Sequence, residues 1–423
     1  MNNEPARRFS LRAVSVGAGA MAPQAINALS SLALQVLAAR QLGVDGFAAF
    51  VLLFGVLVLL TSLQGPFIGD SLVLFDRADP GVRGSLLLLH LGLVGLLGSA
   101  AFVVPLALGL LGVGGALLFA VLTATWLTEE TFRRLFVARV AYWSLTANDL
   151  CYVGITLVGV ATALALGRPF SLITILVAML IGSASSVVIA VAQLPADETR
   201  LVRLSFGAVR EIVDFAVWRA MQAGLRPLAM LTMRLAVLGF AGAAAVSLVE
   251  AGRLLIAPAQ AVVQAATGLV FTQLAAQQRG ARPTLTAQQT QRALVAMTVL
   301  TGVVAVAFAP ALGRLLASDA IPVGRAIVAA WVGYTVVLAL STMVNVRLLV
   351  RKQSRVVFLA RLADSAVGLL LVVVACAAHA FELVPVALAV SLAGSTIYLR
   401  RLVSRSATVP GAAPRAVPVG LRP

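Results

Sequence analysis

Charged residues are scarce in this sequence. Only 11% of its 423 residues are Asp, Glu, Lys or Arg, whereas 61% are hydrophobic. So little charge could not cover the surface of a water-soluble protein of this length. The 45 residues from Gly84 to Thr128 contain no charged side chain, and they suffice for two membrane spans because one span takes about 20 mostly apolar residues. The composition therefore predicts a polytopic helical membrane protein.

Cysteine and histidine are rarer still, at two residues each. Cys151 and Cys376 both lie in apolar stretches, so they indicate neither a disulfide framework nor a metal site. His90 and His379 are isolated, and no glycine-rich phosphate-binding loop precedes a predicted helix. We therefore expect no cofactor, no metal and no ATP-binding domain.

Lysine is nearly absent as well, because Lys352 stands alone and arginine supplies almost all of the basic charge behind the net +16. Arginine dominance with abundant Ala, Leu and Val is typical of a GC-rich bacterial genome. In a soluble protein such a charge would indicate a nucleic-acid partner. In a membrane protein it indicates the cytoplasmic side, where basic residues collect, so we expect no nucleic-acid partner.

Charge clusters and Pro or Gly breaks divide the chain into about twelve spans. With the N-terminus inside, and with basic residues near the end of a span counted on the side where that end lies, 25 of the 32 basic residues fall on the cytoplasmic side, four on the opposite side and three deep within spans. This asymmetry predicts an even number of spans with both termini in the cytoplasm, in a bacterial plasma membrane. The expected spans are 13–39, 46–68, 84–108, 114–135, 149–167, 170–193, 212–240, 244–273, 293–315, 324–350, 355–379 and 383–401.

Two short stretches suggest an internal repeat. "LGVDGFA" (Leu42–Ala48) and "LGFAGAA" (Leu238–Ala244) share the pattern L-G-x-x-G-x-A, and they follow the expected first and seventh spans. Glycines suit a tight turn between helices, although Gly, Ala and Leu are common enough here for chance to produce the match. The repeat predicts two halves of the same orientation. We expect an all-α polytopic membrane protein with about 12 transmembrane helices in two parallel six-helix bundles, 1–200 and 201–405, followed by a disordered cytoplasmic tail, 406–423.

Polar side chains recur at helical spacing inside several spans, where they usually face an interior or a wet cavity. Gln24, Asn27, Ser31 and Gln35 lie on one face of the first span. The seventh and eighth spans carry the three basic residues that we place deep inside the membrane, which are Arg226, Arg234 and Arg253. The polar residues of these two spans are Arg219, Gln222, Arg226, Arg234, Glu250, Arg253, Gln260 and Gln264.

Three stretches resemble bacterial polysaccharide exporters. They are "ARQLGVDGFAAFVLL" (Ala39–Leu53), "LTEETFRRLFVARVAYWSLTANDLCYVG" (Leu127–Gly154) and "EAGRLLIAPAQAVVQA" (Glu250–Ala265). The chain is thus similar to the oligosaccharide-lipid flippases of the multidrug/oligosaccharidyl-lipid/polysaccharide exporter superfamily. This resemblance implies alternating access by two six-helix bundles, with a lipid-linked sugar carried through a central cavity.

The arginines within the spans suit such a substrate. A polyprenyl pyrophosphate carries about two negative charges, and arginine binds phosphate oxygens bidentately while keeping its own charge. We predict that Arg226 and Arg253 line a cavity between the bundles and hold the head group, while the sugar passes along polar faces. The predicted substrate-binding set is Arg226, Arg253, Arg234, Glu250, Gln24, Asn27, Ser31, Gln222, Gln260 and Gln264.

A purely structural interpretation of these charges is also open. Glu250 and Arg253, three residues apart on one helix, could neutralise each other, and Arg219 could reach the cytoplasmic interface. Arg361 and Asp364 could form a similar local pair, although Asp364 is also a candidate for binding a coupling ion.

Other classes of membrane protein compete with the flippase. A facilitator-type transporter would carry a loop motif that "GDSLVLFDRADPGVRG" (Gly69–Gly84) matches in part. A multidrug extruder of the same superfamily would favour acidic and aromatic cavity residues, yet aromatics make up only 6% of this chain. A membrane enzyme would need catalytic residues on a sizeable outer loop, and the outer loops expected here are short. A non-transporting scaffold that binds glycan-assembly enzymes would look much like the flippase.

Overall fold

The computed structural model describes residues 4–199, 202–278, 287–317, 319–350 and 353–407, and these residues contain helices and no strand. Nine stretches of the described chain are long and apolar enough to cross a membrane. One of them, Val209–Gln264, holds two spans because the backbone leaves the helical conformation at Gly242. Two further helices, Glu4–Gln41 and Val113–Ala138, are as long but more polar. The described residues therefore contain twelve segments of spanning length, as the sequence predicts.

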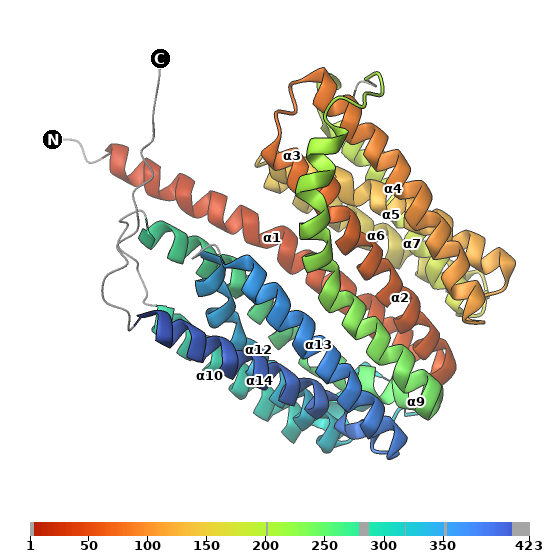
Figure 1. The fold of residues 1–423 in the computed structure, drawn as a ribbon. Coiled ribbons are helices and arrows are strands. Elements are labelled where there is room, and N and C mark those ends of the chain that lie inside the picture. Colours follow the sequence, from red (N-terminus) through yellow and green to blue (C-terminus); the bar gives the residue numbers. More distant parts are fainter. Residues whose placement is uncertain (1–3, 200–201, 279–286, 318, 351–352, 408–423) are drawn as a thin grey trace.

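The first group of helices, here called the N bundle, comprises α1 to α7 and occupies the upper right of Figure 1 apart from α1, which runs between the two groups. Within it α6 packs against α7, and α5 packs against both α4 and α7. The bounds are α1 Glu4–Gln41, α2 Gly43–Gly65, the π-helix η1 Pro66–Asp70, α3 Ser71–Leu74, α4 Pro80–Ala107, α5 Val113–Ala138, α6 Tyr142–Ala165 and α7 Leu172–Gln193.

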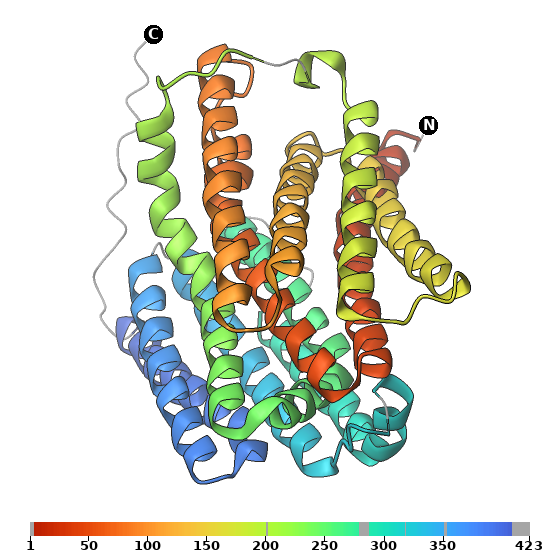
Figure 2. The ribbon, with the colours of Figure 1, turned by 90° about the vertical axis from the view of Figure 1, so that its right-hand side faces the viewer.

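The second group, here called the C bundle, comprises α9 to α14, with the short helix α8 (Ala196–Thr199) before it. Helix α12 packs against α9, α10 and α14, and α13 packs against α9 and α14. Figure 2 shows α9 descending from beside α4 into this bundle. The bounds are α9 Val209–Gln278, α10 Ala287–Ala307, α11 Ala309–Leu316, α12 Arg325–Val350, α13 Ser354–Ala377, the 3₁₀ helix η2 Phe381–Leu383 and α14 Val384–Ala407.

The predicted division of the chain at residue 200 falls on residues outside the described ranges and stays a prediction. The same holds for the tail from 408 onward, whereas residues 406 and 407 continue α14.

The two L-G-x-x-G-x-A stretches both form turns at the same end of the molecule, here called the turn end. Gly43 has φ +70° between α1 and α2, and Gly242 has φ +80° within α9. A Cβ at either glycine would meet nothing within 4 Å, so each glycine is required for its backbone conformation and not for space. Gly43 is the first glycine of its stretch and Gly242 is the second, so the matching turns bend at different positions of the shared pattern.

Helices α2 and α9 run side by side in opposite directions and join the two bundles (Figure 1). Glycines allow the close approach. A Cβ on Gly55 of α2 would collide with the side chains of Arg234 and Leu231, and a Cβ on Gly224 of α9 would lie 2.7 Å from Leu63. This contact, here called the seam, runs from the turn end to the opposite end, here called the charged end, where Asp70, Arg77, Arg139 and Glu198 lie.

Candidate functional site

Each bundle contains a cavity lined by described residues. The cavity of the N bundle, here called the N cavity, has a volume of about 280 Å³, and that of the C bundle, here called the C cavity, about 90 Å³. Helices α1, α2, α5 and α6 line the N cavity, whereas α9, α12, α13 and α14 line the C cavity.

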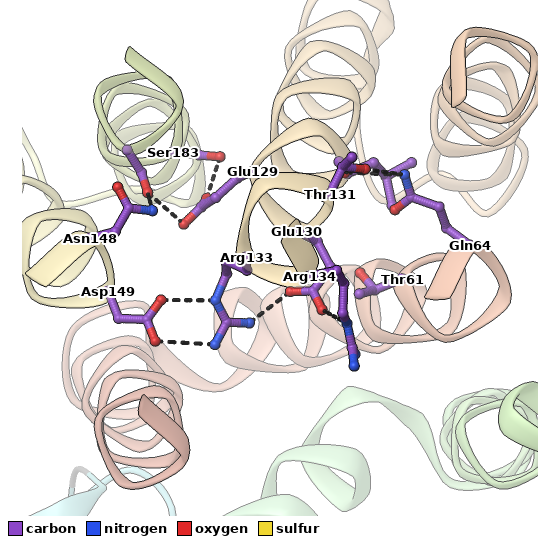
Figure 3. A network of polar contacts seen from close by, with 12 residues as sticks. Thr61, Gln64, Glu129, Glu130, Thr131, Arg133, Arg134, Asn148, Asp149 and Ser183 are labelled. Carbon is purple, nitrogen blue, oxygen red and sulfur yellow. Dashed lines mark hydrogen bonds and ion pairs between the residues drawn. The ribbon is translucent and has the colours of Figure 1, made fainter. Parts of the chain in front are cut away.

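Charged side chains on one wall of the N cavity form a closed network (Figure 3). Helix α5 places Glu130, Arg133 and Arg134 on one face because they are three and four residues apart. Arg133 binds Asp149 of α6 through two hydrogen bonds of 2.8 and 3.1 Å, and its Nη1 donates to Glu130 at 2.7 Å. Arg134 donates from Nε to the other oxygen of Glu130 at 2.8 Å. Two arginines and two carboxylates leave this wall with no net charge.

A second polar cluster lies on the other side of α5. The hydroxyls of Ser183 and Ser186 donate to Glu129 at 2.6 and 3.0 Å, and Asn148 donates to Ser186 at 2.7 Å (Figure 3). All four side chains are buried. These bonds connect α5, α6 and α7, so they fix the helices that carry the wall of the N cavity.

The polar face predicted for the first span lies partly in this cavity. Gln24, Asn27 and Ser31 line it, and they face the cavity from α1. The fourth residue of that face, Gln35, is buried and instead accepts a hydrogen bond from Arg253 of the C bundle. The predicted polar stripe thus serves two places, the N cavity and the contact between bundles.

The C cavity holds two arginines and one aspartate. Arg226 comes from α9, and Arg361 and Asp364 come from α13. Within the described residues neither guanidinium makes a hydrogen bond or lies within 4.0 Å of a carboxylate oxygen. The carboxylate of Asp364 accepts hydrogen bonds from Ser395 at 2.9 Å and from Ser365 at 3.4 Å. The three groups together give the cavity a net charge of +1.

Uncharged polar groups surround the two arginines. Asn345 is buried, and its Oδ1 has no hydrogen-bond partner. The sequence predicted Gln222 and Arg226 as substrate-binding residues, and both line this cavity. The other polar side chains on its wall are Tyr334, Ser341, Ser365 and Ser391.

The remaining predicted arginines meet at Glu250, whose side chain is 1% exposed. Arg234 donates to both of its oxygens, at 2.8 and 3.2 Å, and Arg253 donates to it at 2.7 Å. Arg253 also donates to Gln35 of α1 at 2.8 Å. We therefore correct the expectation that Arg253 shares a cavity with Arg226, because Arg253 does not line the C cavity. Arg234 and Arg253 instead both bind the buried carboxylate of Glu250 between the bundles.

The predicted polar stripe of the eighth span divides in the same way. Gln260 is buried and donates to Thr335 of α12 at 3.3 Å, and Gln264 is exposed. Neither residue lines the N cavity or the C cavity.

Sequence reasoning missed three arginines on the cavity walls. Arg133 and Arg134 lie close to the end of an expected span, where a basic residue is normally assigned to the cytoplasmic interface. Arg361 lies near the start of α13 and was interpreted with Asp364 as a local pair. The signal that could have revealed the first two is the spacing of Glu130, Arg133 and Arg134, which places all three on one helix face.

Comparison with known proteins supports the fold of this chain and nothing beyond the fold. No protein-family model matches the chain, and no curated protein sequence matches it. A solved structure of the lipid II flippase MurJ, in an inward closed conformation, is similar with a TM-score of 0.70 and 10% identity, covering 92% of this chain and 87% of that chain.

Two other solved structures are similar over almost their whole length. An inward-facing multidrug resistance transporter of the MATE family has a TM-score of 0.67 and 14% identity, covering 90% of this chain and 96% of that chain. A transporter of the MOP superfamily from Pyrococcus furiosus has a TM-score of 0.62 and 12% identity, covering 94% and 96%. The chain thus shares the fold of these MATE and MurJ structures, and its long apolar helices make it a multi-pass membrane protein.

Proposed function

We propose that this protein translocates a lipid-linked oligosaccharide or polysaccharide precursor across a bacterial plasma membrane, with both termini in the cytoplasm. The observation that carries the proposal is the pair Arg226 and Arg361 on the wall of the C cavity, without a hydrogen bond or ion pair among the described residues. One arginine at membrane depth costs at least about 2.5–3.5 kcal/mol on insertion scales. An anionic ligand offsets this cost, and a pyrophosphate offers oxygens that two guanidinia can bind together.

The contacts between the bundles are consistent with alternating access. At the turn end, Arg40 of α1 donates to the carbonyl of Leu315 of α11 at 3.0 Å. The Arg253–Gln35 bond lies deeper on the same path. Release of a substrate at the turn end would require these bonds to break while the seam between α2 and α9 persists as the hinge.

Asp364 is proposed as the residue that binds a coupling ion. Its carboxylate faces the C cavity beside the two arginines, and its hydrogen bonds come from serine hydroxyls. A cation bound there would change the charge that the arginines present to a substrate. We further propose membrane lipids and glycan-assembly enzymes as partners, because the product of such enzymes would be the substrate.

A multidrug extruder is the second candidate, favoured by the similarity in fold to a multidrug resistance MATE transporter. Many drug substrates are cations, and the net charge of +1 in the C cavity disfavours them. The two functions differ in the ligand that moves. Protein reconstituted in liposomes should accelerate the translocation of a fluorescent polyprenyl pyrophosphate-linked glucose and should not transport a cationic dye. Transport of the dye without transport of the lipid would support the extruder and contradict the flippase.

A further inference from the structure

Exposed arginines gather at the end of the C bundle where α12 and α14 end and α13 begins. Helices α12 and α13 both pack against α14 (Figure 1). A small hydrophobic cluster draws on all three helix ends, and two of its members, Leu348 and Leu399, adjoin Arg347 and Arg400 in the chain. The arginines therefore belong to one surface, here called the rim. The rim comprises Arg347 of α12, Arg355 of α13, and Arg400 and Arg401 of α14.

The rim arginines have no carboxylate partner among the described residues. The sequence contains no Asp or Glu from residue 320 to residue 363, and none after Glu382. The N bundle differs at the charged end, where Glu198 pairs with both Arg77 and Arg139. The excess of basic residues on the cytoplasmic side of membrane proteins applies to both bundles, so it does not explain why only the rim lacks carboxylates.

Exposed apolar side chains continue from the rim along the same helix faces. Leu359 and Leu362 follow Arg355 on α13 and are 51% and 45% exposed. On α14, Ile397 lies one turn before Arg401 and is 52% exposed. Helical spacing places each leucine and isoleucine on the face of its arginine. A ligand bound at the rim therefore meets positive charge and apolar surface together.

We propose that the rim is a docking surface for anionic glycerophospholipids of the adjacent leaflet. The arginines hold the phosphate, and the acyl chains lie along the apolar faces of α13 and α14. Arginine binds phosphate oxygens bidentately, and a basic cluster at the end of membrane helices suits an anionic lipid. An acidic protein or a free phosphate would use the charge and not the apolar faces. The proposed topology places the rim at the cytoplasmic leaflet.

This inference goes beyond the proposed function and does not depend on the transported substrate. None of the four rim arginines lines the C cavity or the N cavity. An anionic lipid at the rim would therefore bind at the outer surface of the C bundle, apart from the residues proposed to hold a pyrophosphate.

The test measures the binding of three probes to the purified full-length protein in a neutral detergent. The probes are a short-chain phosphatidylglycerol, a phosphatidylcholine with the same acyl chains, and glycerol phosphate, which carries the charge without the chains. The wild type should bind phosphatidylglycerol about 5- to 25-fold more tightly than phosphatidylcholine, because each basic residue near an anionic lipid contributes about fivefold. Glycerol phosphate should bind about tenfold more weakly than phosphatidylglycerol, since burial of acyl methylenes adds affinity.

A rim variant that combines Arg355→Gln, Arg400→Gln and Arg401→Gln should bind the two lipids equally. These substitutions alter exposed side chains, so the thermal unfolding temperature in neutral detergent should stay at the wild-type value. Arg210→Gln is the matched control, because its guanidinium is 95% exposed and lies 3.9 Å from the carboxylate of Asp214. This control should keep the full preference for phosphatidylglycerol.

Two measurements separate the rim from the C cavity. A variant with both Arg226→Ala and Arg361→Ala removes the two arginines of the C cavity, and it should keep the preference for phosphatidylglycerol. The rim variant should still bind polyprenyl pyrophosphate with the affinity of the wild type.

Each contrary outcome has a distinct meaning. Equal affinity of the wild type for the two lipids overturns the inference. A preference that survives in the rim variant, or that disappears with Arg226 and Arg361, assigns the lipid to another site and overturns the inference as well. Glycerol phosphate that binds as tightly as phosphatidylglycerol would show an anion site without lipid docking. Failure of the wild type to bind polyprenyl pyrophosphate would contradict the proposed function and leave the result at the rim unaffected.

Discussion

Arg219 of α9 donates from its Nε to Oδ2 of Asp70 at 2.6 Å, and this ion pair joins the two bundles at the charged end of the seam. Its guanidinium also lies 5.9 Å from the ring of Phe215, which contacts Phe75 edge to face. Both charged side chains are partly exposed, so the pair contributes about 0–1 kcal/mol. The bond marks where α2 and α9 stay together, and it is too weak to lock them.

The seam and the turn end should respond differently to cross-linking. In a background without Cys151 and Cys376, a cross-linker joining Asp70→Cys to Arg219→Cys should leave translocation intact, because the seam persists as the hinge. The same reagent joining Arg40→Cys to Leu315→Cys should stop it, because that contact must open. Translocation assays on cross-linked protein in liposomes measure both. A block at the seam, or free translocation with the turn end joined, would refute the assignment of hinge and gate.

Glu250 should be the carboxylate whose neutralisation lowers the stability of the folded protein most. Removing its charge leaves Arg234 and Arg253 buried without a counter-charge, at a cost of about 3–5 kcal/mol. Glu250→Gln should therefore lower the thermal unfolding temperature strongly. Arg253→Ala should lower it less, since Arg234 still neutralises the carboxylate. If Arg253→Ala keeps its stability yet abolishes the binding of polyprenyl pyrophosphate, Arg253 holds substrate after all.

Gly182 should tolerate no side chain. A Cβ there would collide with Thr156 and lie 2.9 Å from the carbonyl of Tyr152, so α6 and α7 would be pushed apart. Gly182→Ala should cost about 1–3 kcal/mol through overpacking. Gly154→Ala is the matched control on α6, because a Cβ at that position meets nothing within 4 Å. Equal unfolding temperatures for the two variants would show that the helices separate at little cost.

Both ends of the chain should lie in the cytoplasm. The distribution of arginines predicts it, and twelve spans place the two ends on one side. A reporter fused after Arg405 should register as cytoplasmic. A reporter that registers as external would contradict the proposed topology of twelve spans with both ends in the cytoplasm.

The spans could be predicted from the sequence because burial in a bilayer demands long apolar helices with internally satisfied backbones. The meeting of Arg234 with Glu250 was harder to foresee. The pair is 16 residues apart, and it comes together because the chain reverses at Gly242, which lies midway between them. The pairing of Glu250 with Arg253 was visible in the sequence, since three residues on one helix bring side chains together.

The cavity walls were predicted less completely. The predicted stripe of Gln24, Asn27 and Ser31 does line the N cavity. Helical spacing alone places these residues on one face. Arg361 did not stand out, since a basic residue near the end of a span usually faces the interface. Its place beside Arg226 depends on how α13 packs against α9, which no local pattern encodes.

The most direct measurement is the rate at which liposome-reconstituted protein translocates a fluorescent polyprenyl pyrophosphate-linked glucose. Arg226→Ala and Arg361→Ala should each slow it about 10- to 100-fold, the loss expected when a charge-assisted hydrogen bond to an ionised ligand is removed. Arg226→Lys should recover only part of the rate, because an ammonium lacks the bidentate geometry. Arg210→Ala, which removes a 95% exposed guanidinium from the same helix, should translocate at the wild-type rate. Wild-type rates for both Arg226→Ala and Arg361→Ala, with normal insertion, would contradict the account.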